Sequence, residues 1–185
     1  MRPRNLVLGL SVLTLLAVPV FPQGVSAQSL WDLPTYEKAM GLEFAKPVLD
    51  YYDDLSPLSS AIFLSVSWPI NESIRFFGEL PLGYAGRPDS QDSEIGLAPG
   101  NPYLGLTIGE RESELSWRVG ARLPLAPKDK DSSRMVGLFS DQISRLGAFS
   151  NDLLTVPGSS IYRHRAESGF LALITAGVDM WIPVR

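Results

Sequence analysis

The sequence predicts an all-β fold, an antiparallel up-and-down meander that forms an outer-membrane β-barrel or part of one, with one helical loop segment. Three observations predict it. Apolar and polar residues alternate in several segments, as they do along a strand whose successive side chains point to opposite faces. Short and long connections between these segments alternate, as in barrels with short turns at one end and long loops at the other. The 16 glycines and 15 prolines among 185 residues leave few stretches suited to a long helix.

A cleaved signal peptide is predicted over residues 1–27. The chain starts with a positive charge, residues 6–20 carry no charge, and Val25 and Ala27 place a β-branched and a small residue at the −3 and −1 positions. The alternative is an uncleaved N-terminal membrane anchor. Cleavage would leave residues 28–185 as a single antiparallel β-barrel domain, either complete or part of a larger barrel.

Six segments show the alternation expected of strands. Four are clear, at 62–68, 74–83, 103–108 and 115–125, and two are weaker, at 41–46 and 169–184. Pro81 and Pro124 fall within or beside the clear segments, although proline cannot donate to a strand ladder. We therefore expect both prolines at strand ends, where pairing stops or a bulge bends the wall.

An internal repeat supports the hairpin arrangement. Residues 73–82 (SIRFFGELPL) align without a gap on residues 116–125 (SWRVGARLPL), and five of the ten positions are identical. We interpret the two copies as consecutive hairpins with the same structural role. The alignment places Arg75 level with Arg118, and it places Glu79 level with Arg122.

One helix is predicted inside the longest connection. Over residues 134–154, apolar residues recur at spacings of three and four, from Val136 to Leu153, with polar residues on the other side. Gly147 is expected to divide this segment into two shorter helices. We interpret it as a helical loop that packs over the barrel mouth, and the alternative is a constriction that gates the lumen.

The candidate functional residues are the charges on the polar face of the strands. Arg75, Arg118 and Arg122 share this face with Glu79, and Glu43 lies opposite two apolar neighbours in the weak first strand. A polar lumen holds such charges at little cost, whereas an arginine at the lipid midplane costs roughly 2–4 kcal/mol. Arg75, Glu79, Arg118 and Arg122 are therefore predicted to face the lumen. In a narrow closed wall they would pair and fill the interior, and in a wider wall they would stay hydrated and give weak anion selectivity.

Residues 66–85 and 100–106 resemble predicted outer-membrane β-barrel proteins of Gram-negative bacteria, of the transporter-like or porin-like kind. The shared pattern is a strand, a short polar turn, a strand ending in Leu-Pro and a strand start of Gly-Asn-Pro-Tyr. The resemblance implies an outer-membrane location, lipid as a partner and a passive channel or transporter-like role for small solutes. It assigns no catalytic or ligand residues. Six strands are fewer than the eight of the smallest such barrels, which indicates a truncated member or further strands within the predicted loops.

Composition excludes several other classes. The absence of cysteine rules out disulfides, thiolate metal sites and a thiol nucleophile. A net charge of −4 argues against nucleic-acid binding, which needs a basic face. No phosphate-binding glycine loop is present, so we expect no cofactor. No metal is expected either, because the chain offers no thiolate ligands and no calcium-loop spacing. The expected partners are outer-membrane lipids, small solutes and further copies of the chain.

An enzymatic role is also not expected. The single histidine, His164, lies near Ser159, Ser160 and Asp152 in sequence, but the Gly-x-Ser-x-Gly turn of serine hydrolases is missing. A calcium site formed by Asp89, Asp92 and Glu94 lacks the EF-hand spacing, so a solvated loop is the simpler interpretation. The main alternative to a membrane barrel is a soluble periplasmic β-sandwich or lipocalin-like binding protein, in which the apolar face would form the core.

Overall fold

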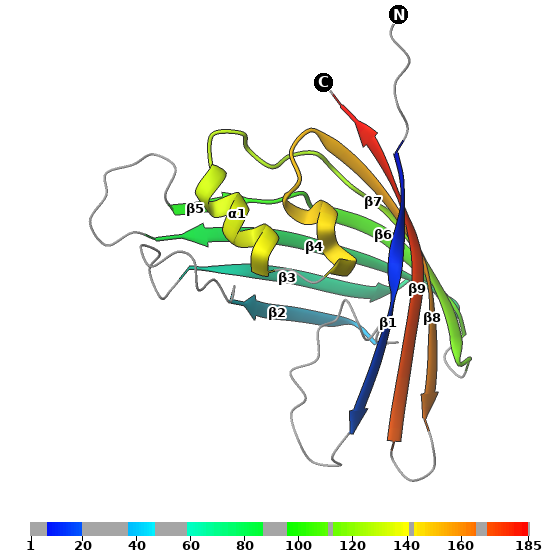
Figure 1. The fold of residues 1–185 in the computed structure, drawn as a ribbon. Helices are drawn as coiled ribbons and strands as arrows, with labels where there is room; N and C mark the ends of the chain where they lie inside the picture. The colour runs from blue at the N-terminus through cyan, green and yellow to red at the C-terminus, as the bar shows by residue number, and fades with distance from the viewer. Residues whose placement is uncertain are drawn as a thin grey trace, which may run out of the picture.

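The computed structural model describes residues 7–19, 37–46, 59–86, 96–110, 113–140, 143–165 and 170–184. In these residues the chain forms one curved, nine-stranded sheet, whose concave side holds a helix, α1, and a short 3-10 helix, η1 (Figure 1). All strand pairs are antiparallel, and the order is β1-β9-β8-β7-β6-β4-β3-β2, with β5 also paired to β4. The predicted all-β antiparallel fold class is confirmed.

The elements follow one another as a meander. In chain order they are β1 (Val7–Pro19), β2 (Ala39–Ala45), β3 (Ser60–Pro69), β4 (Ile74–Ala85), β5 (Gly96–Pro99), β6 (Tyr103–Ile108), β7 (Leu115–Arg122), α1 (Asp131–Ser140), η1 (Ile143–Phe149), β8 (Leu153–Arg165) and β9 (Phe170–Pro183). The six predicted strands correspond to β2, β3, β4, β6, β7 and β9. We refer to strands β2–β9 as the wall.

Two strands lie where the sequence predicted loops. The 13-residue strand β8 lies inside the predicted long connection. It was not predicted from the sequence because Pro157, Gly158 and two serines interrupt its alternation of apolar and polar residues. The four-residue strand β5 is too short to show any period. The predicted strand 115–125 is shorter in the structure, where β7 ends at Arg122.

The predicted helix 134–154 is wrong in its limits. It is replaced by α1 and η1, and the apolar Leu153 and Leu154 begin β8 instead. The chain reverses at Asp152, whose φ of 55° lies in the left-handed region. The expectation that Gly147 divides the helical segment is wrong, because this residue lies within η1. A Cβ at Gly147 would lie 2.6 Å from the Thr155 hydroxyl oxygen, so the glycine permits close packing of η1 on β8.

Strand β1 comes from the segment predicted to be a signal peptide. It pairs antiparallel with β9, from Val7 opposite Trp181 to Pro19 opposite Phe170. Strand pairing in this segment bears on neither export nor cleavage. The signal peptide therefore remains a prediction.

The two prolines lie where ladder hydrogen bonds are not required. Strand β4 pairs with β6 as far as Glu79 and with β5 from Leu82 onward, so Pro81 falls between the two partners. Its carbonyl still accepts a hydrogen bond from the Gly100 amide at 2.8 Å. Pro124 lies beyond the end of β7. The expectation that the prolines lie at strand ends is confirmed for Pro124 and wrong for Pro81, which lies inside β4 and pairs with Phe63 of β3.

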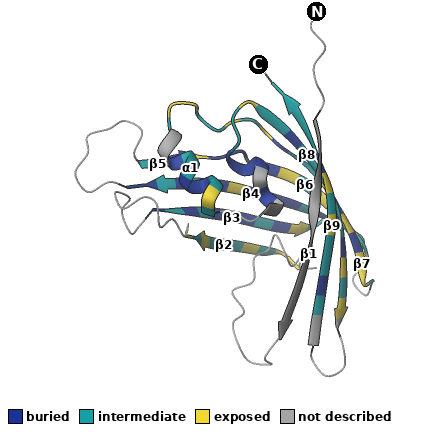
Figure 2. Cartoon of the chain, viewed as in Figure 1, coloured by how far each residue is buried: buried dark blue, intermediate teal, exposed yellow. Residues whose placement is uncertain are grey.

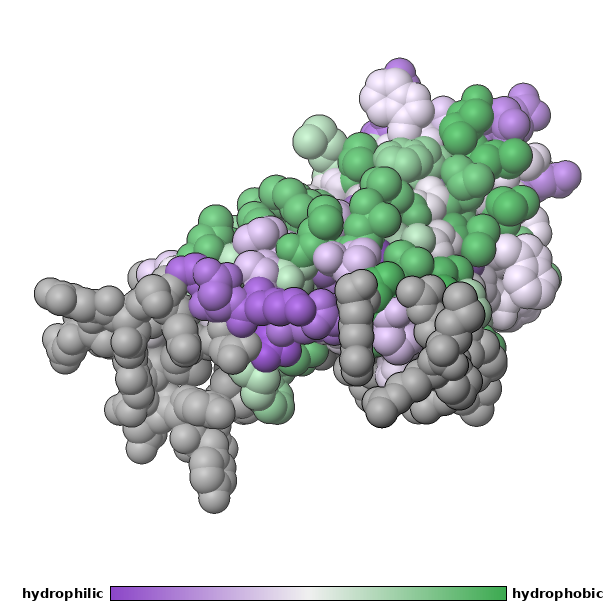
Figure 3. Space-filling model, turned by 90° about the horizontal axis from the view of Figure 1, so that it is seen from above, coloured by the Kyte–Doolittle hydropathy of each residue, from purple (hydrophilic) through white to green (hydrophobic). Residues whose placement is uncertain are grey.

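The wall has an apolar convex face and a charged concave face. The charged residues of β2–β9 whose side chains are described all share the inward register: Glu43, Arg75, Glu79, Arg118, Arg122, Arg163 and Asp179. Exposed and buried positions both occur along the strands of the wall (Figure 2). Leu115 and Val119 are 42% and 47% exposed on the convex side, whereas Arg118 and Arg122 are 5% and 1% exposed. The predicted facing of β7 is confirmed. Figure 3 shows hydrophobic residues gathered over a large part of the surface it draws, beside a hydrophilic strip.

Close packing of α1 on the wall depends on Gly83 in β4. A Cβ at this position would lie 2.3 Å from the backbone oxygen of Ser133 in α1. We expect Gly83→Ala to displace α1 and to lower the free energy of unfolding by about 1–3 kcal/mol, as overpacked sites do. The matched control is Gly158→Ala in β8, where the nearest atom is 3.9 Å from the new Cβ. Denaturant titration of both variants checks this, and equal midpoints would contradict it.

Candidate functional site

The wall brings the repeat-related charges into two parallel rows on the concave face. Arg75 pairs with Thr107, which pairs with Arg118. Four residues farther along each copy, Glu79 pairs with Tyr103, which pairs with Arg122. Strand β6 therefore lies between the two copies of the repeat. The levels predicted from the internal alignment, Arg75 with Arg118 and Glu79 with Arg122, are confirmed.

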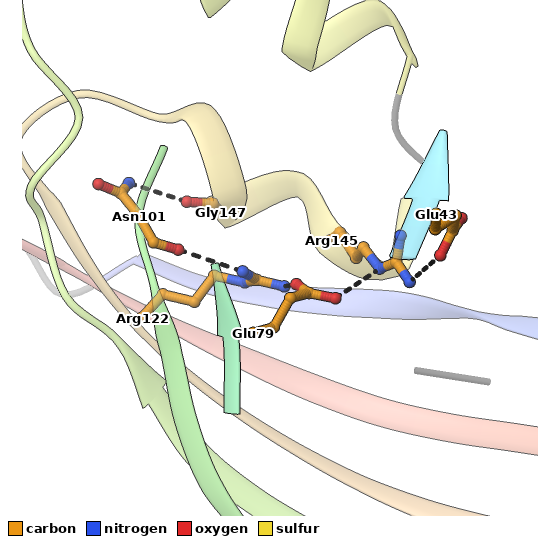
Figure 4. Close-up of polar contacts among 6 residues, drawn as sticks. All are labelled: Glu43, Glu79, Asn101, Arg122, Arg145 and Gly147. Carbon is orange, nitrogen blue, oxygen red and sulfur yellow. Dashed lines mark hydrogen bonds and ion pairs between the residues drawn. The ribbon is translucent and has the colours of Figure 1, made fainter. Parts of the chain in front are cut away.

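A chain of alternating charges crosses the concave face from β2 to β7 (Figure 4). Glu43 Oε2 lies 2.8 Å from Arg145 Nη2, and Arg145 Nε lies 3.3 Å from Glu79 Oε2. Glu79 Oε1 in turn lies 2.8 Å from Arg122 Nη2. We call Glu43, Arg145, Glu79 and Arg122 the ion-pair chain. It joins η1 directly to β2 and β4 and, through Glu79, to β7.

The inner members of the ion-pair chain are removed from solvent. The side chains of Glu79, Arg122 and Arg145 are 0%, 2% and 1% exposed, while that of Glu43 is 28% exposed. Burying a charge is unfavourable unless it is paired and hydrogen-bonded. The alternation of sign meets the pairing requirement, because each buried guanidinium of the chain has a carboxylate within ion-pair distance and Glu79 pairs with both.

Aromatic rings complete the surroundings of the concave-face arginines. The Arg145 guanidinium lies 4.3 Å from the centre of the Phe63 ring, and that of Arg118 lies 4.8 Å from the Phe77 ring. A cation above an aromatic face is attracted by the ring quadrupole, most strongly where water is excluded. These contacts place both guanidiniums within cation–π distance of an aromatic ring inside the fold.

Asn101 holds η1 and the segment after β7 against the wall. This fully buried residue donates from Nδ2 to the carbonyls of Gly147 at 2.9 Å and Ser150 at 2.6 Å, and its Oδ1 accepts from the Ala126 amide at 2.8 Å. Its backbone carbonyl accepts a hydrogen bond from Arg122 Nη1 at 3.2 Å. Asn101 therefore links the ion-pair chain to the backbone of the helical region.

The predicted lumen-facing residues all lie on the concave face, and Glu79 and Arg122 pair directly. Arg75 and Arg118 occupy the second row, 2% and 5% exposed. Direct pairing of Glu79 with Arg122 is the arrangement that the sequence predicts for a narrow wall, in which inward charges pair and fill the interior. Sequence reasoning did not identify Arg145, which lies in the helical region. Asn101 appeared only as part of a strand-start motif.

The residues of the hypothetical serine hydrolase are not brought together. Ser160 and His164 are four residues apart on β8, about 13 Å along a strand. Asp152 forms an ion pair with Lys128 at 2.7 Å. His164 Nδ1 instead lies 2.6 Å from Glu114 Oε1, and the Tyr162 hydroxyl donates to Glu114 Oε2 at 2.8 Å.

Glu114 should confer a measurable pH dependence on stability. Hydrogen bonds from His164, and next from Tyr162, lower the pKa of this carboxyl below its ordinary value of 4.5. A lowered folded-state pKa stabilises the fold above the unfolded-state value, and the contribution is lost as pH falls through the folded-state value. We expect the wild-type protein to exceed Glu114→Gln in denaturation midpoint at pH 7 and to lose this advantage in acid below pH 4.5.

Removal of the two donors provides the control for this prediction. In a Tyr162→Phe, His164→Phe background, replacing Glu114 should change the midpoint equally at both pH values. A pH-independent difference in the wild-type background would contradict the role given to these hydrogen bonds.

Metal ligation and helical membrane spans are not seen in the described residues. Their histidines, aspartates and glutamates form no group of three or more suited to a metal ion. Neither α1 nor η1 is long and apolar enough to cross a bilayer. The acidic residues Asp89, Asp92 and Glu94, for which the sequence favours a solvated loop over a calcium site, lie outside the described residues.

Comparison with protein-family models, with curated proteins and with solved structures found no match to the chain. The resemblance to outer-membrane barrels thus remains a prediction from the sequence.

Proposed function

We propose that this protein is an outer-membrane β-barrel protein with a passive channel or transporter-like role for small solutes. The observation that carries the proposal is the separation of charge in the wall: the described side chains of the charged Asp, Glu and Arg residues in β2–β9 point inward, and the outward positions are apolar or aromatic except for Ser60, Ser160 and His164. In lipid, an outward charge is expensive and an outward leucine is favourable, whereas in water the preference is reversed. The arrangement is therefore suited to a hydrocarbon surrounding.

The convex face supports the proposal in detail. One outward row in register crosses six strands as Trp68, Phe76, Leu106, Val119, Gly158 and Val178. Soluble monomers rarely expose contiguous apolar surface of this extent. Trp68 and Trp117 are 51% and 56% exposed near the short turns, and Lys38 Nζ lies 4.0 Å from the centre of the Trp68 ring. Amphipathic rings with nearby lysines are typical of a membrane–water interface.

The soluble alternatives require a different arrangement. A lipocalin-like binder needs an apolar concave face, but here that face carries the ion-pair chain and the Arg75–Arg118 row. A β-sandwich needs a second sheet over its apolar face. In the part of the chain that the structure describes, the strands form one sheet and the helices contact its concave side. Neither alternative explains outward leucines together with inward arginines.

Cell fractionation tests the proposal. A membrane barrel stays with outer membranes through a high-salt wash and migrates differently on gels before and after boiling. A soluble periplasmic protein is released by osmotic shock and shows no such change in mobility. Release by osmotic shock would refute the membrane role.

Export should expose a new N-terminus. We expect the mature protein to begin at Gln28, because the segment before it has the charge and residue pattern of a cleaved signal. Mass spectrometry of the purified protein checks this. Replacing Ala27 by arginine should block processing, with Gln23→Arg as the control outside the −3 and −1 positions. Recovery of intact Met1 from the wild-type protein would contradict the prediction.

A further inference from the structure

Helices α1 and η1 occupy the space that the wall curves around. Helix α1 contacts β3, β4 and β5, and η1 contacts β1 and β8. Phe149 of η1 packs edge-on against Phe63 of β3, with ring centres 6.1 Å apart, and Ala148 joins Ala61 in the same buried cluster. The two helices thus fill the concave side at the level of the ion-pair chain.

Polar contacts supply much of the attachment of these helices. Arg145 of η1 pairs with Glu43 and Glu79, Asn101 donates to carbonyls of the η1 region, and the Ser133 hydroxyl of α1 donates to the Gly96 carbonyl at 2.7 Å. The wall beneath also presents hydrophilic groups, including the buried Ser65 and Thr155. Water can replace helix contacts to such groups, so the wall remains compatible with a hydrated interior after the helices leave.

An ion pair joins the two ends of the helical segment that lies between β7 and β8. The exposed Lys128–Asp152 ion pair, 2.7 Å long, joins the residues that lead into and out of the helices. The Asp152 carbonyl also accepts a hydrogen bond from the Val184 amide at 2.8 Å, next to the end of β9. The two helices can therefore move as one unit while β7 and β8 keep their pairing.

We propose that α1 and η1 form a detachable plug, and that Arg145 is the latch that holds it to Glu79 and Glu43. The plug closes the interior of the proposed barrel in the structure described here, and its release opens a path for solute. This inference rests on the proposed membrane role. It adds a closed state and names the residue that controls it.

A single engineered cysteine reports plug release without any need for transport. The chain has no native cysteine, and Val136 of α1 is 1% exposed. Val136→Cys nearly conserves volume, so it should react slowly with a water-soluble maleimide while the plug is seated. We expect Arg145→Gln in this background to accelerate labelling at least about tenfold in lipid vesicles, because local opening controls the reactivity of a buried group. Glu43→Gln should have a smaller effect, since Glu79 still holds Arg145.

Arg118→Gln is the matched control, because it removes a buried inward arginine from the other row. Its labelling rate should stay near that of the parent. Swelling of liposomes in a small neutral sugar is measured on the same samples, and Arg145→Gln should be more permeable than Arg118→Gln.

The outcomes separate the latch from the membrane role. Membrane-integrated Arg145→Gln protein that is labelled no faster than Arg118→Gln would overturn the latch, and so would equal acceleration in both variants. Faster labelling of Arg145→Gln without any gain in permeability would overturn the gating role of the plug. Loss of the wild-type protein from membranes in a salt wash would refute the proposed function itself.

Discussion

Replacing Glu79 by glutamine is expected to lower the free energy of unfolding by about 3–5 kcal/mol, as loss of one partner from a buried ion pair does. The Glu79 carboxylate lies 2.8 Å from Arg122 and 3.3 Å from Arg145, and the residue is 3% exposed. Glutamine keeps the shape but removes the charge. Arg122 and Arg145 would then lose the carboxylate with which both pair, although Arg145 would keep its ion pair with Glu43.

Urea titration of the folded protein in lipid vesicles measures this effect, with heat-modifiable gel mobility as the signal for the folded state. Glu43→Gln is the control, because the Glu43 side chain pairs with Arg145 but is 28% exposed, whereas Glu79 is buried. Its effect should be well below that of Glu79→Gln. Equal effects would mean that burial does not set the strength of these pairs.

A double-mutant cycle isolates the Glu79–Arg122 contact. If the two side chains act as a pair, Glu79→Gln with Arg122→Gln should destabilise the protein by less than the sum of the single changes. The reason is that the second substitution removes the charge that has lost its Glu79 partner. Additive effects would show that each residue acts through other neighbours.

The wall was predictable because its periodicity is local. Alternation in the segment 115–125 predicted that Leu115 and Arg118 point to opposite faces, and they do so in the structure. The gapless repeat also predicted an arrangement between strands, because it placed Glu79 level with Arg122 although the two residues are on separate hairpins. Both results depend on one strand rule, that side chains alternate between faces with a period of two.

The remainder depends on contacts that no local pattern encodes. Strand β8 was missed because Pro157 and Gly158 resemble loop residues, and only its pairing with β7 and β9 makes it a strand. Arg145 lies on a helix, and its approach to Glu79 requires the docking of segments 66 residues apart. Asn101 precedes a proline and has the appearance of a turn residue. Its burial follows from the packing of η1 above it.

The convex face gives the prediction with the greatest consequence for function. We expect Leu104→Arg to destabilise the membrane-inserted protein by about 2–4 kcal/mol, the cost of an arginine near the lipid midplane. Leu104 is 49% exposed, and its cross-strand neighbours are Gly78, near the middle of β4, and Ala121. These small neighbours leave room for the longer side chain. Crowding therefore cannot account for a loss of stability.

The control is Ile70→Arg, in the turn that follows β3, where the side chain is 60% exposed. An arginine there lies at the membrane–water boundary, where the expected cost is only about 0–1 kcal/mol. The amount of each variant in salt-washed outer membranes, together with its urea midpoint in vesicles, measures the difference. A soluble protein would respond in the opposite way, because a charge on an exposed apolar surface is neutral or favourable in water. Leu104→Arg protein that is as stable as Ile70→Arg, and more soluble than wild type, would therefore place the convex face in water and remove the basis for a membrane barrel.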